Sequence, residues 1–227
     1  MTLQAELLDN PLWSSLSTLH RSFARGGGDV LRYPAAVAPF LAVRAAASRI
    51  DAELAALVAP DETVFLIGPR PGVPASWRTG DLGTILQMVC PAPPPVPAGA
   101  PIVALGPEHH PAILALTALV YPHYFRPRTT ELGRYFGIFD GGTLAAMIGE
   151  RMGMPGYREI SAVCTHPAFA GRGLARRLLA LLTTDIAAGG ATPFLHVSPG
   201  NTRAVELYEQ NGYRTRVALG FASLRRA

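Results

Sequence analysis

Two glycines, Gly171 and Gly173, stand where a strand-like run (159–165) gives way to a helix-like run (173–187). A turn between a strand and a helix leaves backbone N–H groups unpaired at the positive end of the helix dipole, which favours an anion such as a pyrophosphate. Glycine has no Cβ, so a ligand can approach the backbone closely. Gly-Arg-Gly is also ordinary turn chemistry, and the neighbouring segments must decide between the two interpretations.

A second polar segment follows one helix later. The run 193–198 predicts another strand, and Asn201 and Tyr208 lie on the helix predicted after it. These two residues are seven positions apart, close to two helical turns, so they share a face. Gly212 and Tyr213 follow the helix.

These two segments together resemble the cofactor-binding motifs of the GNAT superfamily of acyl-CoA-dependent N-acyltransferases. The first is similar to the turn that holds the pyrophosphate of coenzyme A, and the second to the pattern N-x-x-A-x-x-L-Y…G-[FY]. The resemblance is dense over 130–217 and looser toward the N-terminus, where the chain resembles bacterial acetyltransferases of this superfamily. In the pattern [QR]-x-x-G-x-[GA], Gly173 and Ala175 fit but Ala170 occupies the first position, so one side-chain contact is missing while the backbone donors remain.

The resemblance implies acetyl-CoA as cosubstrate and no metal. Main-chain groups of Val163 would face the thioester or pantetheine. Arg172 and Arg176 would meet phosphates, although exposed helix positions explain these two residues equally well. Asn201 would cap its helix and also bind the cofactor, and capping alone is the alternative. The residues expected to contact the cofactor are Val163, Thr165, Gly171, Arg172, Gly173, Leu174, Ala175, Arg176, Asn201 and Ala204.

Acyl transfer to an amine requires a general base. Deprotonating a lysine-like amine at pH 7 costs about 4–5 kcal/mol. Glu159-Ile160 matches the glutamate that acts as base in the histone-acetylating branch of the family, so Glu159 is the first candidate, and a solvated carboxylate at a strand end is the alternative. Glu150 is the second candidate, because a hairpin turning at 154–156 places it near residue 160.

A general acid would assist the departing thiolate, and Tyr208 is the candidate because a tyrosine of ordinary pKa is protonated at pH 7. A packing aromatic with a satisfied hydroxyl is the alternative. Cys164 could suggest a covalent intermediate, but on a regular strand it faces away from Glu159 and is better interpreted as a small buried apolar residue. His196, on the second strand, either lines the acceptor side or is hydrogen-bonded in the core.

Composition indicates a globular protein. The chain has 227 residues, 49% hydrophobic and 16% charged, and no apolar run of membrane-spanning length. Two cysteines and an N-terminus without secretory features favour the cytoplasm. The net charge is +4 and all 20 basic residues are arginine, but they are scattered, so we do not expect a nucleic-acid partner.

The predicted fold is α/β (α+β), with a GNAT-like mixed, partly splayed sheet and flanking helices. We expect a small α/β N-terminal module over 1–90, a proline-rich linker over 91–101 and the acyltransferase domain over 102–227. In the module, apolar spacing predicts one helix from Leu12 to Phe23 and another over 43–58, then strands over 63–67 and 84–89. In the domain it predicts helices over 109–120, 129–133, 173–187 and 201–210, and strands over 102–105, 135–139, 143–152, 157–165, 193–198, 213–217 and 219–224.

The expected activity is transfer of an acetyl group from acetyl-CoA to a primary amine of a small molecule or peptide. A non-catalytic module that binds acyl-CoA is the alternative, with Ala170 as its support. The N-terminal module could shape the acceptor pocket, mediate a homodimer, or be a degenerate copy of the same fold.

Overall fold

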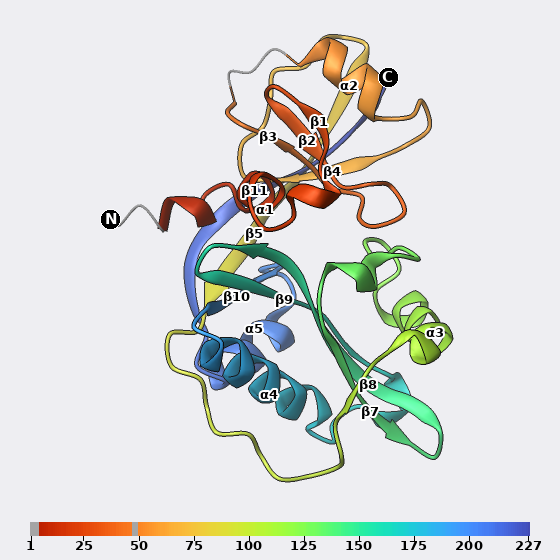
Figure 1. Ribbon diagram of the computed structural model, residues 1–227, viewed down its shortest axis with the longest axis vertical. Helices are drawn as coiled ribbons and strands as arrows, with labels where there is room; N and C mark the ends of the chain where they lie inside the picture. The colour runs from red at the N-terminus through yellow and green to blue at the C-terminus, as the bar shows by residue number, and fades with distance from the viewer. Residues whose placement is uncertain (1–4, 47–49) are drawn as a thin grey trace.

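A computed structural model of the chain describes residues 5–46 and 50–227. Its main feature is a sheet in the order β4-β11-β5-β10-β9-β8-β7-β6, in which only β9 and β10 run parallel (Figure 1). Its strands are β4 (Val64–Ile67), β5 (Trp77–Val89), β6 (Val103–Ala104), β7 (Tyr135–Asp140), β8 (Thr143–Met154), β9 (Tyr157–Thr165), β10 (Thr192–Val197) and β11 (Arg214–Arg226). The predicted mixed α/β fold is confirmed.

Helices cover both faces of this sheet. On one face, α4 (Leu174–Ala188) packs a stripe of leucine and isoleucine at helical spacing against β8, β9 and β10, and α5 (Thr202–Gln210) joins the same core. On the other face, α3 (His110–Val120) covers β8 and β9. A short 3-10 helix, η4 (Thr129–Leu132), precedes β7, and η3 (Pro107–His109) precedes α3.

The N-terminal residues form short elements around one end of the sheet. They are η1 (Ala5–Leu8), α1 (Pro11–Ser17), η2 (Arg21–Phe23), the three-stranded sheet β1 (Arg25–Gly27), β2 (Val30–Arg32) and β3 (Leu41–Val43), and α2 (Asp51–Leu57). Their apolar core includes Trp77 of β5 and Leu224 of β11. The strands β5 and β11 therefore connect this end of the molecule with the helix-covered end (Figure 1).

The sheet crosses the predicted boundary between module and domain. β4 and β5 precede the proline-rich segment 91–101, yet they lie in the same sheet as the later strands. That segment lies along α4, where Nε of Arg177 donates to the carbonyl of Ala100 at 2.9 Å and Oγ1 of Thr184 donates to that of Pro94 at 3.2 Å. The segment thus connects two strands of one sheet and is bound to α4 along its length. The division into a module over 1–90, a linker over 91–101 and a domain over 102–227 stays a prediction.

Several predicted elements differ in extent from those observed, among them the strand predicted over 84–89, which is the end of the longer β5. The strands over 213–217 and 219–224 are the single strand β11, because two bulges against β5 bend it without ending it. The helix predicted over 43–58 is α2, seven residues long, and residues 47–49 lie outside the described residues. The helix predicted from Leu12 to Phe23 ends at Ser17, and Leu19 is 49% exposed because it follows that end.

Candidate active site

The two parallel strands part where the cofactor motif begins. β9 and β10 pair from Tyr157↔Thr192 to Ile160↔Leu195 and no further. A bulge in β9 follows these pairs. Between the pairs Gly149↔Ser161 and Met147↔Cys164, β8 advances by two residues and β9 by three, so β9 has one extra residue. Ala162 within it has a φ of 50°, a left-handed conformation that costs a non-glycine residue about 1–3 kcal/mol. The bulge bends β9 away from β10 and opens the gap between them.

The glycine turn lies at the mouth of this gap. Gly171 and Gly173 have φ of 79° and 73°, and a Cβ at either would meet no atom within 4 Å. In α4, Arg177 donates its backbone N–H to the carbonyl of Gly173 at 3.1 Å. The N–H groups of residues 174–176 lie ahead of this first helical bond and face the open side of the turn. The turn can therefore hold an anion by main-chain donors.

A cavity of about 760 Å³ joins the turn to the gap. Every residue predicted to contact the cofactor lines it: Val163, Thr165, Gly171, Arg172, Gly173, Leu174, Ala175, Arg176, Asn201 and Ala204. Tyr208 and Arg203 line it too. Arg203 was not predicted, although its place two residues after Asn201 in the motif helix could have indicated it.

Two of the polar side chains predicted to contact the cofactor already have partners. Oδ1 of Asn201 accepts from the backbone N–H of Ala204 at 3.2 Å, so it caps α5 as the capping interpretation predicts. Nη1 of Arg172 donates to Asp140 at 2.8 Å, and its guanidinium lies 4.9 Å from the ring centroid of Phe169. The backbone donors of the turn are the part of the site that needs no rearrangement.

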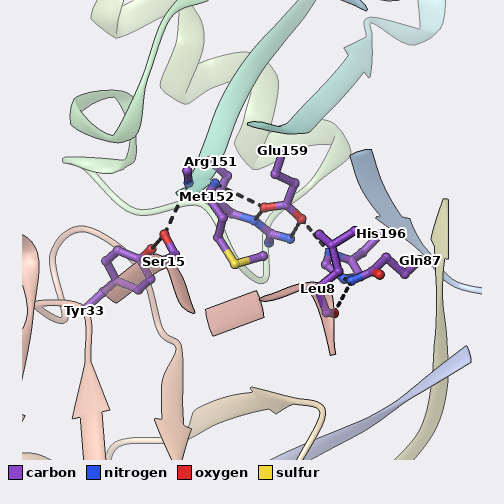
Figure 2. A network of polar contacts seen from close by, with 9 residues as sticks. Leu8, Ser15, Tyr33, Gln87, Arg151, Met152, Glu159 and His196 are labelled. Atoms are coloured by element: carbon purple, nitrogen blue, oxygen red, sulfur yellow. Dashed lines mark hydrogen bonds and ion pairs between the residues drawn. The ribbon is translucent and has the colours of Figure 1, made fainter. Parts of the chain in front are cut away.

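Glu159 lies in a buried ionic network (Figure 2). The network lies on the sheet face opposite α4, because Ile160, the next residue in β9, packs in the core under α4. Its carboxylate accepts from Nε and Nη2 of Arg151 at 2.7 and 2.6 Å and from the N–H of Met152 at 3.3 Å. Burial alone would raise the pKa of Glu159, but the charge and hydrogen bonds of Arg151 outweigh it and lower that pKa to about 2. Glu159 does not line the cavity, whereas Arg151 does. A carboxylate so placed is a weak base at pH 7.

His196 extends the network with a defined tautomer. Gln87 must turn its Nε2 toward His196, because its Oε1 accepts from Nε of Arg216 at 2.5 Å. Nε2 of Gln87 donates to the carbonyl of Leu8 at 2.9 Å and lies 3.1 Å from Nε2 of His196. The imidazole Nε2 is then the acceptor, and Nδ1–H donates to Glu159 at 2.7 Å. His196 is hydrogen-bonded on both sides, as one of its two predicted roles requires, and it also lines the cavity. That it lies on the acceptor side stays a prediction.

The N-terminal segment is attached to β8 by a second polar cluster, also drawn in Figure 2. The N–H of Gly153 donates to Oγ of Ser15 at 3.2 Å, and Ser15 lies 2.9 Å from the hydroxyl of Tyr33. That hydroxyl is 3.0 Å from Nδ1 of His20. Burial, together with the charge of Arg158, lowers the pKa of His20 to about 4.

We expect acid to weaken the fold through His20. Its pKa in the fold is below the ordinary 6.5, so its contribution to stability is complete above pH 6.5 and is lost as the pH falls toward 4. A shift of this size corresponds to about 3 kcal/mol. Urea unfolding at pH 7 and pH 4.5 should show a smaller loss for His20→Gln than for the wild type. Equal losses in the two proteins would contradict this assignment.

Glu150 lies apart from Glu159. The predicted register is present, with Glu150 opposite Ile160, but paired residues share a face, and Ile160 belongs to the core under α4. Its carboxylate accepts from Nη2 of Arg134 at 2.6 Å, and Arg134 also pairs with Asp185 of α4. The two carboxylates therefore lie on opposite faces of the sheet, and Glu150 does not line the cavity.

Tyr208 is the predicted catalytic residue that does line the cavity. Burial raises its pKa, so the hydroxyl stays protonated well above neutral pH. Among the described residues no hydrogen-bond partner of this hydroxyl is found, and the ring lies 6.0 Å from that of Tyr213. Cys164 is packed under α3, on the same face as Glu159, because the bulge reverses its expected direction. Burial raises the pKa of its thiol to about 12, which makes it a poor nucleophile.

Comparison with known proteins agrees with this geometry. Residues 135–222 match the family model of FR47-like proteins. A crystal structure from Novosphingobium aromaticivorans, described as an acetyltransferase from the GNAT family, is 35% identical with a TM-score of 0.87, and the match covers 97% of this chain and 98% of that one. The chain belongs to the GNAT family.

Two further matches differ in extent. N-alpha-acetyltransferase RimI of Mycobacterium tuberculosis is 40% identical over 83 residues, which make up 35% of this chain and 51% of RimI, so the match spans about half of that curated relative. A GCN5-related N-acetyltransferase from Kribbella flavida shares the fold over 98% of this GNAT chain and 96% of its own, with a TM-score of 0.64 and 17% identity. In the described part of the chain, no helix is long and apolar enough to cross a membrane.

Proposed function

We propose that the protein is an N-acetyltransferase that moves an acetyl group from acetyl-CoA to a primary amine of a small molecule or peptide. The observation that carries this proposal is one cavity that joins the amide turn at 171–176, the bulged end of β9 and Tyr208. The family membership of the chain supports it.

Each part of the cavity has a separate task in this proposal. The turn amides, helped by Arg176 and Arg203, hold the diphosphate of coenzyme A. Backbone groups freed by the bulge at Ala162 and Val163 lie beside the gap and can hydrogen-bond the thioester arm or its carbonyl. Tyr208 supplies a proton to the departing sulfur. Glu159 fixes Arg151 and His196 in place, which makes it a positioning residue here instead of the base.

Two measurements test the proposal. Coenzyme A should raise the melting temperature of the protein, because a ligand that binds only the folded state stabilises it. Acetyl-CoA should release free thiol when a panel of primary amines is added. If coenzyme A does not stabilise the protein and no amine gives thiol release, the proposal is overturned.

Gly173→Ala is expected to weaken coenzyme A binding at least tenfold. Gly173 has a φ of 73°, which alanine adopts only with strain, and the shift that relieves the strain would turn the amides of α4 away from the diphosphate. Gly141→Ala is the matched control, since Gly141 has a φ of 54°, equally open surroundings, and a place in the β7–β8 turn. Titration calorimetry with coenzyme A compares the two. Equal affinities in both variants would contradict an anion site at this turn.

A non-catalytic acyl-CoA-binding module is the second candidate. Ala170 at the position of the missing motif side chain favours it, as does the absence of aspartate and glutamate among the described residues that line the cavity. Stabilisation by coenzyme A without thiol release from any amine would support this candidate over the enzyme.

A further inference from the structure

The cavity extends beyond the cofactor motifs into a part walled by aromatic and aliphatic side chains. These residues, all aromatic or aliphatic except Thr84, come from β4, β5, β11, the end of α3 with the segment after it, and the N-terminal region: Phe40, Ile67, Leu82, Thr84, Ile85, Val120, Tyr121, Tyr124 and Phe221. We call this part the aromatic half. None of these elements carries the glycine turn, so the aromatic half is open to the second substrate.

Tyr124 is the centre of the aromatic half. Its ring is stacked on Phe40 at a centroid distance of 5.9 Å and lies 6.0 Å from Phe221 and 5.6 Å from Tyr121. Phe65 packs edge-on against it at 5.0 Å. Aromatic rings so arranged favour an aromatic or large aliphatic group of a ligand over a small or hydrated one.

The charge in this half disfavours a cationic ligand. The charged side chain that lines the cavity beside this half is Arg151, whose guanidinium lies 4.8 Å from the ring centroid of Phe40. Nε and Nη2 of Arg151 are bound to Glu159, while for Nη1 no partner is found among the described residues. Burial raises the pKa of Tyr121 to about 12, and the pKa of Tyr124 is raised as well, so neither hydroxyl offers an anion to an ammonium group at neutral pH.

The protonation of the amine has a large effect in such a cavity. An α-amine with a pKa near 8 is neutral in about one molecule in ten at pH 7, whereas a lysine-like amine is neutral in about one in 2,500. No described carboxylate lines the cavity to remove the proton from a strongly basic amine. A weakly basic amine needs no such group.

We propose that the acceptor is a weakly basic primary amine carried beside an aromatic or large aliphatic group, such as the α-amine of an aromatic amino acid derivative or of a peptide that begins with an aromatic residue. This proposal rests on the proposed function and names its substrate class. Polyamines and lysine side chains are outside the class.

The reaction balances without a further group. The neutral nitrogen forms a bond to the thioester carbon and the C–S bond breaks. The nitrogen loses one proton and the sulfur gains one, so acetyl-CoA and amine give amide and free thiol. Tyr208 donates to the sulfur and recovers its proton from the pool that the nitrogen supplies.

Four amines separate the effect of the ring from that of basicity. Phenylalaninamide and alaninamide have weakly basic α-amines with and without a ring. Phenethylamine keeps the ring with a strongly basic amine, and β,β-difluorophenethylamine lowers the basicity of that amine without adding a carbonyl. At pH 7 we expect kcat/KM for phenylalaninamide to exceed that for alaninamide about tenfold or more, and the difluoro compound to exceed phenethylamine about tenfold or more.

Tyr124→Leu tests the aromatic half directly. The ratio of kcat/KM for phenylalaninamide to that for alaninamide should fall at least fivefold, because the leucine cannot stack on Phe40. Phe139→Leu is the matched control, since Phe139 packs near α3 and does not line the cavity, and its ratio should equal that of the wild type.

The outcomes distinguish the two proposals. Thiol release with spermidine or lysine that exceeds release with phenylalaninamide would overturn the acceptor class and leave the enzyme standing. Equal ratios in wild type and a folded Tyr124→Leu would overturn it as well. No release with any amine, in a protein that coenzyme A does not stabilise, would overturn the proposed function itself.

Discussion

Tyr208→Phe is expected to lower kcat about a hundredfold while the affinity for coenzyme A changes little. General acid catalysis contributes about 10²–10⁴-fold in rate, and Tyr208 lines the cavity, so its hydroxyl is the proposed donor. Because burial raises the pKa of Tyr208, full proton transfer to a thiolate is uphill, and the hydroxyl also acts as a hydrogen-bond donor to the developing charge. Steady-state kinetics with thiol detection measure kcat.

Tyr213→Phe is the control for this prediction. Tyr213 lies beside Tyr208 and is also buried, but its hydroxyl bonds to Oγ1 of Thr183 at 2.7 Å and it does not line the cavity. Its loss should cost stability of about 1 kcal/mol and leave kcat near that of the wild type. A Tyr208→Phe protein that keeps more than a third of the wild-type kcat would exclude the hydroxyl as general acid.

Arg151→Met is expected to lower the free energy of unfolding by about 3–5 kcal/mol, because it leaves the buried carboxylate of Glu159 without its charge partner. The melting temperature should fall by roughly 6–20 °C for a chain of this size. At the same time the pKa of Glu159, held at about 2 by Arg151, should rise into or above its ordinary range. Urea unfolding and calorimetry measure these effects.

Two further variants make this prediction specific. In Arg151→Met with Glu159→Leu, most of the lost stability should return, since no charge remains buried. Arg128→Met breaks an exposed pair with Glu131 and should leave the free energy of unfolding nearly unchanged. The double variant could instead lose as much free energy of unfolding as the two single variants together. That result would show that packing, and not the ion pair, determines the loss of stability at this site.

The part of the cavity formed by the glycine turn and the start of α5 could be predicted from the sequence because its elements are local. The turn from Gly171 to Ala175 and the cap at Asn201 depend on residues a few positions apart, so spacing alone indicates their geometry. Each lies where it was expected along the cavity wall. Contact of these residues with coenzyme A stays a prediction.

The environment of Glu159 could not be predicted in the same way. A bulge between Glu150 and Gly153 sets both Arg151 and Met152 opposite Glu159, and a bulge leaves no clear mark in the residue types here. The partners Gln87 and His196 come from strands that meet only in the folded sheet. The aromatic half could not be predicted either, because its residues lie far apart in the sequence, from Phe40 to Phe221.

The position of β5 has a consequence for how the chain is made. Both of its neighbours in the sheet, β10 and β11, are encoded more than a hundred residues later, as the 109-residue separation between Gln87 and His196 illustrates. On the ribosome β5 cannot pair both of its edges until β10 and β11 have left the exit tunnel, so the nascent protein is exposed to aggregation during that interval. A nonsense codon a few residues before β11 would therefore leave a product that cannot close its sheet, and such a product would become a substrate for chaperones and proteases.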